Sequence, residues 1–161
     1  GFIQSSSSIM QVIVESLRVY VDTSVKKTIK EDVNIEETIE TVKTNLNKLI
    51  TERNGILEFE NLEQIQTIRF SSPMLVLILQ NIIQNGMKYN DSPIPKVKIS
   101  ISRKQNKILF KLSDNGVGIK TEFLEKIFQP FKTLENKSVI KSSGLGLTIC
   151  KNIIEKYDFR L

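Results

Sequence analysis

Two neighbouring segments alternate strictly between apolar and polar residues, and this alternation limits the possible fold more than any other feature of the sequence. Residues 96–102 read KVKISIS and residues 107–113 read KILFKLS, with the four residues RKQN between them. Because successive side chains of a β-strand point to opposite faces of a sheet, the alternation predicts two half-buried strands. The short polar connection indicates that they form an antiparallel hairpin.

The segments around this hairpin predict further helices and strands. Apolar residues at helical spacing or helix start signals predict helices over residues 8–27, 35–50, 73–89, 120–128 and 144–157. A change of period predicts two short strands within residues 56–70, and residues 158–161 read as the start of another. Residues 32–34 break the pattern, and residues 129–143 are irregular. We therefore expect an α/β fold, a two-layer sandwich with helices covering one face of a mixed sheet and an additional N-terminal helix.

Length and charge limit the class of protein. With 161 residues the chain suits one domain with a short appended element. The net charge of +5, from 23 basic and 18 acidic residues, is spread along the chain and permits an anionic ligand. No basic run with interleaved aromatic residues occurs in the sequence, so we expect no nucleic-acid partner.

Cysteine, histidine and hydropathy limit the chemistry. The single cysteine, Cys150, excludes a disulfide framework and a zinc cluster and suits a reducing compartment. No stretch approaches the roughly 20 apolar residues of a membrane span, and the first residues lack the basic segment of a signal peptide. We expect a cytoplasmic location, which includes the cytosolic part of a membrane-bound sensor. The sequence contains no histidine, so no imidazole of this chain is available as base, metal ligand or phosphoacceptor.

The helix predicted from Pro73 carries an unusual polar stripe. At 100° per residue, one side collects Asn81, Gln84, Asn85 and Lys88, and the other side collects Leu75, Leu79, Ile82, Ile83 and Gly86. The pair Asn85-Gly86 is also a hairpin signal, but a turn there would scatter both sets. A solvated face would explain the stripe, although asparagine is an indifferent helix former. The stripe therefore has a structural and a functional interpretation.

Two glycine-containing loops favour the functional interpretation. Asp114 follows a predicted strand and precedes Gly116 and Gly118, which can let the backbone approach a ligand closely. Further on, Ser143-Gly144-Leu145-Gly146 opens the last predicted helix, where exposed N–H groups form an anion site. Plain turns and caps would explain each loop alone. The long polar segment between the loops indicates a lid.

Four motifs in this order resemble a known family. Asn81-x-x-x-Asn85-x-x-Lys88-Tyr89 is similar to the N-box of histidine kinases, and Asp114-x-Gly116-x-Gly118-Ile119 is similar to their G1 box. The segment IFQPF, with Phe128 and Phe131, resembles their F-box, and Gly144-Leu145-Gly146-Leu147 resembles their G2 box. Residues 33–161 thus resemble the catalytic, ATP-binding domain of a two-component sensor histidine kinase, within the superfamily of gyrase, Hsp90 and MutL.

The resemblance implies a Bergerat-type ATP-binding fold and a set of site residues. The catalytic domain would occupy residues 31–161, and residues 1–30 would be the C-terminal helix of a dimerisation and phosphoacceptor hairpin. The residues that the resemblance assigns to ATP are Asn81, Asn85, Lys88, Tyr89, Asp114, Gly116, Gly118, Ile119, Phe128, Lys132, Ser143, Gly144, Leu145, Gly146 and Leu147. Of these, Asn81, Asn85 and Lys88 would also be catalytic, and Asn85 would bind Mg²⁺. Gly86 stands where the family usually has alanine.

The resemblance also implies roles and partners. Asp114 would accept a hydrogen bond from the adenine amino group, and Tyr89 would pack against the base. Lys88 would bind the phosphates, and residues 143–147 would offer backbone amides to them. Gyrase- and Hsp90-type ATPases carry glutamate at position 81 to activate water, so Asn81 favours phosphoryl transfer to a side chain over hydrolysis. The implied partners are an acceptor histidine outside the printed sequence, a response regulator and a second copy of the full-length protein. A serine-kinase relative of the anti-sigma type and a nucleotide-binding scaffold without turnover are the alternatives.

Overall fold

The computed structural model describes residues 14, 15, 17–19, 21–23, 29–105, 107–132 and 143–159. The chain divides into two compact units. The sheet unit comprises Ile29–Gly118, and the terminal unit comprises Gly1–Thr28 together with Ile119–Leu161. No helix in the described part of the chain combines the length and the apolar character that crossing a membrane requires.

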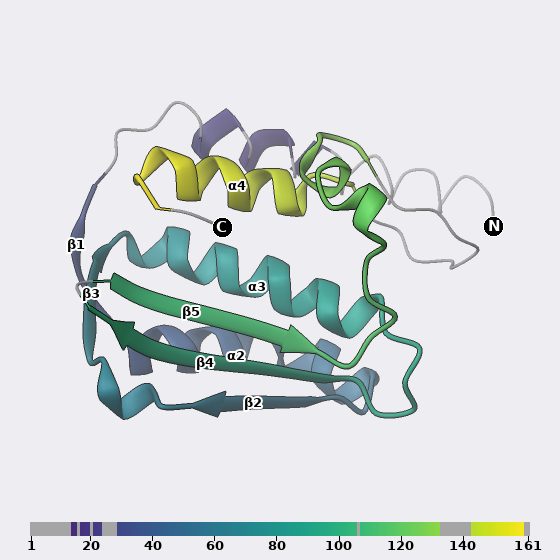
Figure 1. Ribbon diagram of the computed structural model, residues 1–161, viewed down its shortest axis with the longest axis horizontal. Coiled ribbons are helices and arrows are strands. Elements are labelled where there is room, and N and C mark those ends of the chain that lie inside the picture. The colour runs from purple at the N-terminus through teal and green to yellow at the C-terminus, as the bar shows by residue number, and fades with distance from the viewer. Residues whose placement is uncertain are drawn as a thin grey trace. The chain divides into compact units, whose positions relative to one another are not determined.

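The sheet unit contains a three-stranded mixed sheet. Its strands are β2 (Ile56–Glu60), β4 (Lys96–Lys104) and β5 (Lys107–Asp114), in the spatial order β2-β4-β5 (Figure 1). Strand β4 pairs antiparallel with β5, with Ile99 opposite Leu112, and parallel with β2, with Ile99 opposite Phe59. The predicted hairpin and the predicted mixed sheet are confirmed.

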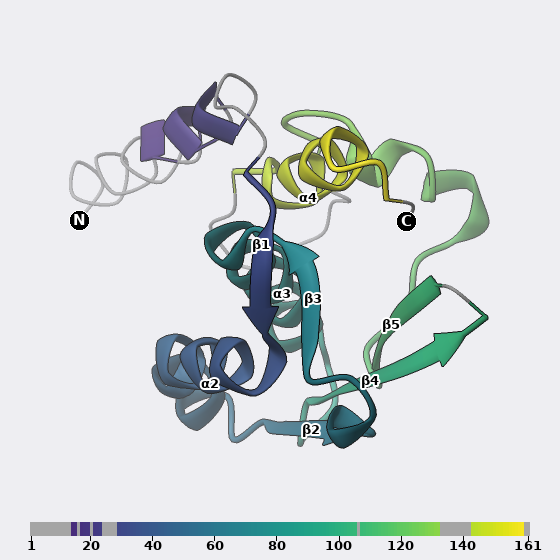
Figure 2. The same ribbon diagram turned by 90° about the vertical axis from the view of Figure 1, so that its left-hand side faces the viewer.

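A second pair of strands was only half predicted. Strand β1 (Glu31–Asn34) pairs antiparallel with β3 (Thr67–Phe70), and the two lie side by side in Figure 2. Strand β3 lies within the segment predicted to form strands, whereas residues 32–34 were expected only to break a pattern. Only Val33 of β1 is buried, so this strand is too short for an alternation of burial to be visible in the sequence.

Two helices cover one face of the three-stranded sheet (Figure 2). Helix α2 (Ile35–Glu52) begins where the Asn34 side chain accepts a hydrogen bond from the Glu37 N–H at 3.1 Å, a standard N-cap. Helix α3 (Ser72–Lys88) has a proline in its first turn, where a missing N–H costs nothing. The core between helices and sheet is apolar, and its fully buried side chains include Ile35, Ile39, Val42, Leu46, Leu79, Ile83, Met87, Val97, Ile99 and Ile101.

Gly86 allows α3 to pack closely on the sheet. A Cβ atom at this position would lie 2.7 Å from Val97 Cγ2 and 3.3 Å from Asp114 Cβ, closer than van der Waals contact permits. Gly86 therefore belongs to the buried side of α3, as the helical wheel predicted, and Asn85-Gly86 is not a turn. The close contact brings the last two turns of α3 against the end of β5.

The regular elements of the terminal unit are helices and 3₁₀ turns in its described residues. Residues 14, 15, 17–19 and 21–23 are helical, and α4 spans Gly146–Lys156. The Lys156 ammonium donates a hydrogen bond to the Thr23 carbonyl at 2.8 Å and so connects the two segments. Burial raises the pKa of the Cys150 thiol in α4 to about 12, which keeps it protonated and inert at neutral pH.

Two predictions for this unit need correction. The helix expected over residues 120–128 is wrong: the structure has two 3₁₀ turns, η2 (Thr121–Phe123) and η3 (Lys126–Phe128). Nine residues are few for an α-helix, and Pro130 disfavours helical geometry at the residue before it. The strand expected to start at residue 158 is absent at Asp158 and Phe159, and its remainder lies outside the described residues, as do residues 8–13 and 24–27 of the first helix.

The packing of Gly86 on Val97 generates a stability prediction. Gly86→Ala gains about 1 kcal/mol of helix propensity, but its methyl group must displace a stiff, buried valine, at a cost of roughly 1–3 kcal/mol. In the double variant with Val97→Ala the methyl group enters the vacated space. We expect the double variant to be about 1 kcal/mol more stable than the sum of the single effects, as measured by urea unfolding. Additivity within about 0.3 kcal/mol would contradict this packing.

Candidate functional site

The predicted polar stripe lies on the last two turns of α3. Asn81 and Asn85 are half-buried, and the Asn81 Nδ2 donates to the Leu77 carbonyl at 3.0 Å, which leaves its side-chain oxygen available. In the described part of the chain, the Asn85 side chain makes no hydrogen bond and Lys88 makes no ion pair. Tyr89 follows as the C-cap residue and is 40% exposed. The stripe thus presents unused polar groups.

The loop after β5 adjoins this stripe within the sheet unit. Asp114 is the last residue of β5, is exposed, and accepts a hydrogen bond from the Gly116 N–H through Oδ1 at 2.8 Å. A Cβ at Gly116 would lie 3.0 Å from the Tyr89 carbonyl oxygen. The loop therefore touches the turn that ends α3, and the structure brings the predicted N-box and G1 residues together.

The two glycines of this loop differ in their surroundings. Gly116 is required by the protein itself, because a side chain there would collide with Asp114 and with the turn at Tyr89. Gly118 adopts φ +70°, which favours glycine, and its Cβ position has no neighbour within 4 Å. Of the two, Gly118 leaves the open space that a ligand could enter. Ile119, which follows it, is 45% exposed.

The F-box and G2 residues come together in the terminal unit. The Phe131 N–H donates to the Gly144 carbonyl at 3.0 Å, and the Thr148 hydroxyl donates to the Phe128 carbonyl at 3.0 Å. Gly144 has φ +66°, and a Cβ there would lie 2.8 Å from the Phe131 carbonyl carbon. Lys132 is exposed beside this contact. The segments before and after the undescribed residues 133–142 are thus joined.

The first turn of α4 presents backbone donors. The Ser143 hydroxyl accepts a hydrogen bond from the Leu145 N–H at 3.3 Å, so this amide is already used. No side chain caps the helix beyond this point, so the N–H groups of Gly146, Leu147 and Thr148 are free of helical partners. Leu145 is buried, whereas Gly146 and Leu147 are half-buried. Of the backbone amides predicted to bind an anion, that of Leu145 is thus engaged, and those of Gly146 and Leu147 have no helical partner.

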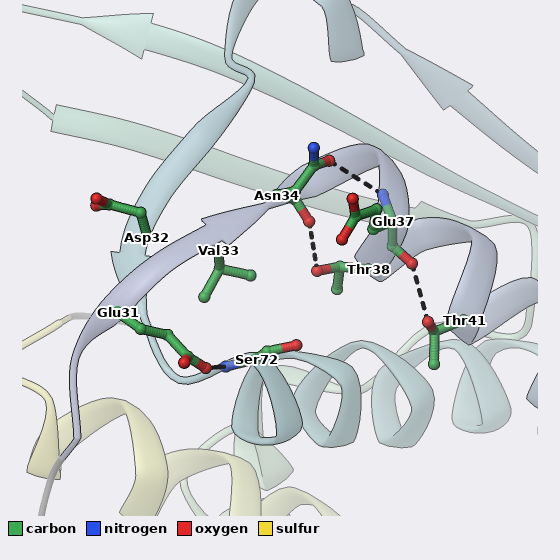
Figure 3. A pocket seen from close by; sticks show the side chains of 8 residues that line it. All are labelled: Glu31, Asp32, Val33, Asn34, Glu37, Thr38, Thr41 and Ser72. Atoms are coloured by element: carbon green, nitrogen blue, oxygen red, sulfur yellow. Dashed lines mark hydrogen bonds between the residues drawn. The ribbon is translucent and has the colours of Figure 1, made fainter.

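A hollow of about 270 Å³ lies elsewhere in the sheet unit, at the start of α2 (Figure 3). Its lining residues are Glu31, Asp32, Val33, Asn34, Glu37, Thr38, Thr41 and Ser72, none of which belongs to the four motifs. The dashed contacts in Figure 3 show that its polar groups serve the starts of two helices: Asn34 caps α2, and Glu31 accepts from the Ser72 N–H at 3.1 Å. We interpret the hollow as a by-product of this capping.

No cluster of metal-binding side chains marks the predicted site in the described part of the chain. Among the described residues, no group of three His, Cys, Asp or Glu side chains could hold a metal ion. The hydrogen bond that the Lys98 ammonium donates to the Glu60 carboxylate raises the pKa of Lys98, which is not one of the motif residues. Any metal at the predicted site would therefore depend on neutral asparagine oxygens and on the ligand itself.

Three residues around the site were not singled out by sequence. Arg53, at the end of α2, donates to the Met87 carbonyl at 3.2 Å and to the Asn90 carbonyl at 2.8 Å. The Asn90 side chain in turn donates to the Asn115 side chain at 2.8 Å. The only sequence signal was that Asn90 and Asn115 adjoin the motif residues Tyr89 and Asp114.

Comparison with known proteins shows the family. Residues 70–161, more than half of the chain, match the family described as histidine kinase-, DNA gyrase B-, and HSP90-like ATPase. The chain belongs to this family. The resemblance stated from the four motifs and the predicted α/β fold are both confirmed.

The sequence relatives are much longer than this chain. The chain is 29% identical over 154 residues to the phytochrome-like protein Cph1 of Synechocystis, covering 96% of this chain and 20% of that protein. It is 33% identical over 95 residues to sporulation kinase D of Bacillus subtilis, covering 59% of this chain and 18% of that protein. The chain thus spans about a fifth of the length of the curated relatives it matches.

Solved structures share the fold. The catalytic domain of histidine kinase ThkA matches with a TM-score of 0.65 and 28% identity, covering 78% of this chain and 80% of that one. Full-length ShkA in complex with AMPPNP matches with a TM-score of 0.78 over 94% of this chain and 32% of that one. At 19% identity, ShkA shows a likeness of fold alone.

The two left-handed glycines generate a matched prediction. Gly118→Ala and Gly144→Ala both force a side chain into positive φ, at about 1–2 kcal/mol. Only Gly144→Ala adds a collision with the Phe131 backbone, which we expect to cost roughly 1–3 kcal/mol more. Urea unfolding and hydrogen exchange of the Phe131 amide measure this difference. Equal destabilisation, with the Phe131 amide equally protected in both variants, would contradict the contact.

Proposed function

We propose that the chain binds Mg-ATP at the stripe of α3 and the loop after β5, and donates the γ-phosphate to a histidine outside the printed sequence. The observation that carries this proposal is the juxtaposition, within one compact unit, of Asn81, Asn85 and Lys88 with the Asp114 loop. The side chains of Asn85 and Lys88 are unused by the described part of the protein. A merely solvated helix face would not require a glycine loop against its end.

The adenine base would be recognised by Asp114 and Tyr89. The Gly116 N–H holds Asp114 Oδ1, which leaves Oδ2 to accept the exocyclic amino group. A carboxylate accepts such a hydrogen bond strongly. The exposed Tyr89 ring would pack against the base, and Gly118 leaves space for it.

The phosphates would be held by neutral and basic groups. The side-chain oxygens of Asn85 and Asn81 are hard ligands of the kind that Mg²⁺ prefers, with the remaining ligands coming from phosphate and water. When bound, Mg²⁺ neutralises phosphate charge. Lys88 would contribute a positive charge, as a partner for the negatively charged phosphates. Since phosphoryl transfer depends mostly on positioning and charge neutralisation, this set of groups is sufficient.

Transfer to a histidine, rather than hydrolysis, follows from Asn81 and from the missing imidazole. An amide side chain cannot act as the base that activates water, so the chain lacks that function at position 81. The printed sequence contains no histidine, so the acceptor is a domain of the parent protein or of a partner chain. ThkA has been solved in complex with the response regulator TrrA, and a response regulator is the partner we propose for this protein.

The N-terminal segment is proposed to be the C-terminal helix of a dimerisation hairpin, over residues 1–30. Residues 14, 15, 17–19 and 21–23 are helical, and Val14, Leu17 and Val21 are exposed at positions i, i+3 and i+7. This spacing places them along one side of the helix. An exposed apolar stripe of this kind suits packing against a second helix in a homodimer of the full-length protein, in the cytoplasm.

Nucleotide binding tests the proposal directly. We expect Asn85→Ala to weaken binding of a non-hydrolysable ATP analogue with Mg²⁺ by at least roughly tenfold, about 1.4 kcal/mol, in titration calorimetry. The matched control is Asn47→Ala, the same change at an exposed position of α2, which should bind as the unmodified chain does. Absence of binding to the unmodified chain, or equal binding by all three proteins, would favour the scaffold alternative.

The acceptor is tested with labelled ATP. The chain alone should yield no acid-labile phosphohistidine, because it contains no histidine. Addition of a histidine-containing dimerisation domain from the parent protein should yield it. Acid-stable phosphoserine on an added protein, without acid-labile label, would instead support the serine-kinase alternative.

A further inference from the structure

We infer that Asn115 and Asn90 are positioning residues for adenine recognition, a role that rests on the function proposed above. Neither is expected to touch the nucleotide. Together they fasten the turn that carries Tyr89 to the loop that carries Asp114. The inference rests on the hydrogen bonds of these two side chains.

Asn115 uses the full hydrogen-bonding capacity of its side chain. Its Oδ1 accepts from the Lys96 N–H at 2.7 Å and from Asn90 Nδ2 at 2.8 Å. Its Nδ2 donates to Ser92 Oγ and to the Ile94 carbonyl, both at 3.1 Å. An amide offers two donors and two acceptor sites, and all four are occupied. Only a side chain with both an acceptor and a donor end can make this set of contacts.

Asn90 supplies the buried half of the connection. It is 2% exposed, and its Nδ2 donates to the Gly86 carbonyl at 3.1 Å as well as to Asn115. Its Oδ1 accepts from the Ser92 N–H at 3.0 Å. Arg53 holds the Asn90 carbonyl from the other side, with a positive charge near the end of α3 where a helix dipole favours one. The turn after α3 is thus held from both sides.

This network controls the two groups proposed to bind adenine. Asp114 itself is exposed, and its side chain accepts a local hydrogen bond from the Gly116 N–H. Asn115, the next residue, therefore links the Asp114 carboxylate to the turn at Tyr89. Loss of the Asn115 side chain would leave the loop free to move away from that turn. Loss of this link would weaken recognition of the base more than it weakens binding of the phosphates.

The ratio of affinities for ADP and IDP isolates base recognition. The two nucleotides carry identical phosphates, but IDP has a carbonyl where ADP has the amino group that Asp114 would accept. We expect the affinity of the unmodified chain for ADP to exceed its affinity for IDP by roughly 10- to 100-fold, which is the range for a hydrogen bond to a charged group. Calorimetry with Mg²⁺ measures both affinities for the unmodified chain, Asn115→Ala, Asn115→Asp and the control Asn47→Ala.

Asn115→Ala should reduce the ADP/IDP ratio to within about threefold of unity, while Asn47→Ala keeps the ratio of the unmodified chain. Asn115→Asp retains the two accepted bonds and loses the two donated ones, so its ratio should be intermediate. Its added charge repels both nucleotides alike and cancels in the ratio. If thermal melting shows that Asn115→Ala is unfolded, the ADP/IDP ratio of Asn115→Asp tests the inference in its place.

An unchanged ratio in folded Asn115→Ala, or in Asn115→Asp where the alanine variant is unfolded, overturns the inference and leaves the proposed function intact. A lowered melting temperature with an unchanged ADP/IDP ratio also overturns the inference, because Asn115 would then have a structural role alone. Failure of the unmodified chain to bind either nucleotide overturns the proposed function itself.

Discussion

The contact between Gly86 and the sheet is the constraint on which the candidate site depends. With no side chain at this position, α3 lies against Val97 of β4 and Asp114 of β5. The residues on either side of Gly86 in the helix are then fixed relative to the end of β5. One face of α3 fills the core, and the opposite face presents Asn81, Asn85 and Lys88 beside a loop that begins with a carboxylate. The same contact that buries the helix therefore creates a polar site at its edge.

The sequence was most informative where burial imposes a strict period. The alternation of Val97, Ile99 and Ile101 predicted β4 because each is buried on one face. The helical stripe of α3 was predictable for the same reason, since Leu79 and Ile83 are buried one turn apart. The four motifs then identified the family, because their order along the chain is far more specific than any one of them.

The remaining features depend on contacts between distant residues and leave no period in the sequence. Strand β1 has one buried residue and exists because it pairs with β3 across more than thirty positions. Asn90 and Asn115 are polar neighbours of motif residues, and only the fold shows that they bond to each other. Gly116 was expected to admit a ligand, yet its nearest constraints are Asp114 and the carbonyl of Tyr89. The roles of these residues follow from the close approach of two loops.

The central claim is that Mg-ATP binds where α3 meets the loop after β5, and not at the hollow beside α2. Amide chemical-shift mapping of the labelled chain during titration with a Mg-bound ATP analogue tests it most directly. We expect the largest shifts at residues 81–89 and 114–118, with residues 31–41 unaffected. Shifts centred on residues 31–41, with residues 81–89 and 114–118 unmoved, would contradict the account.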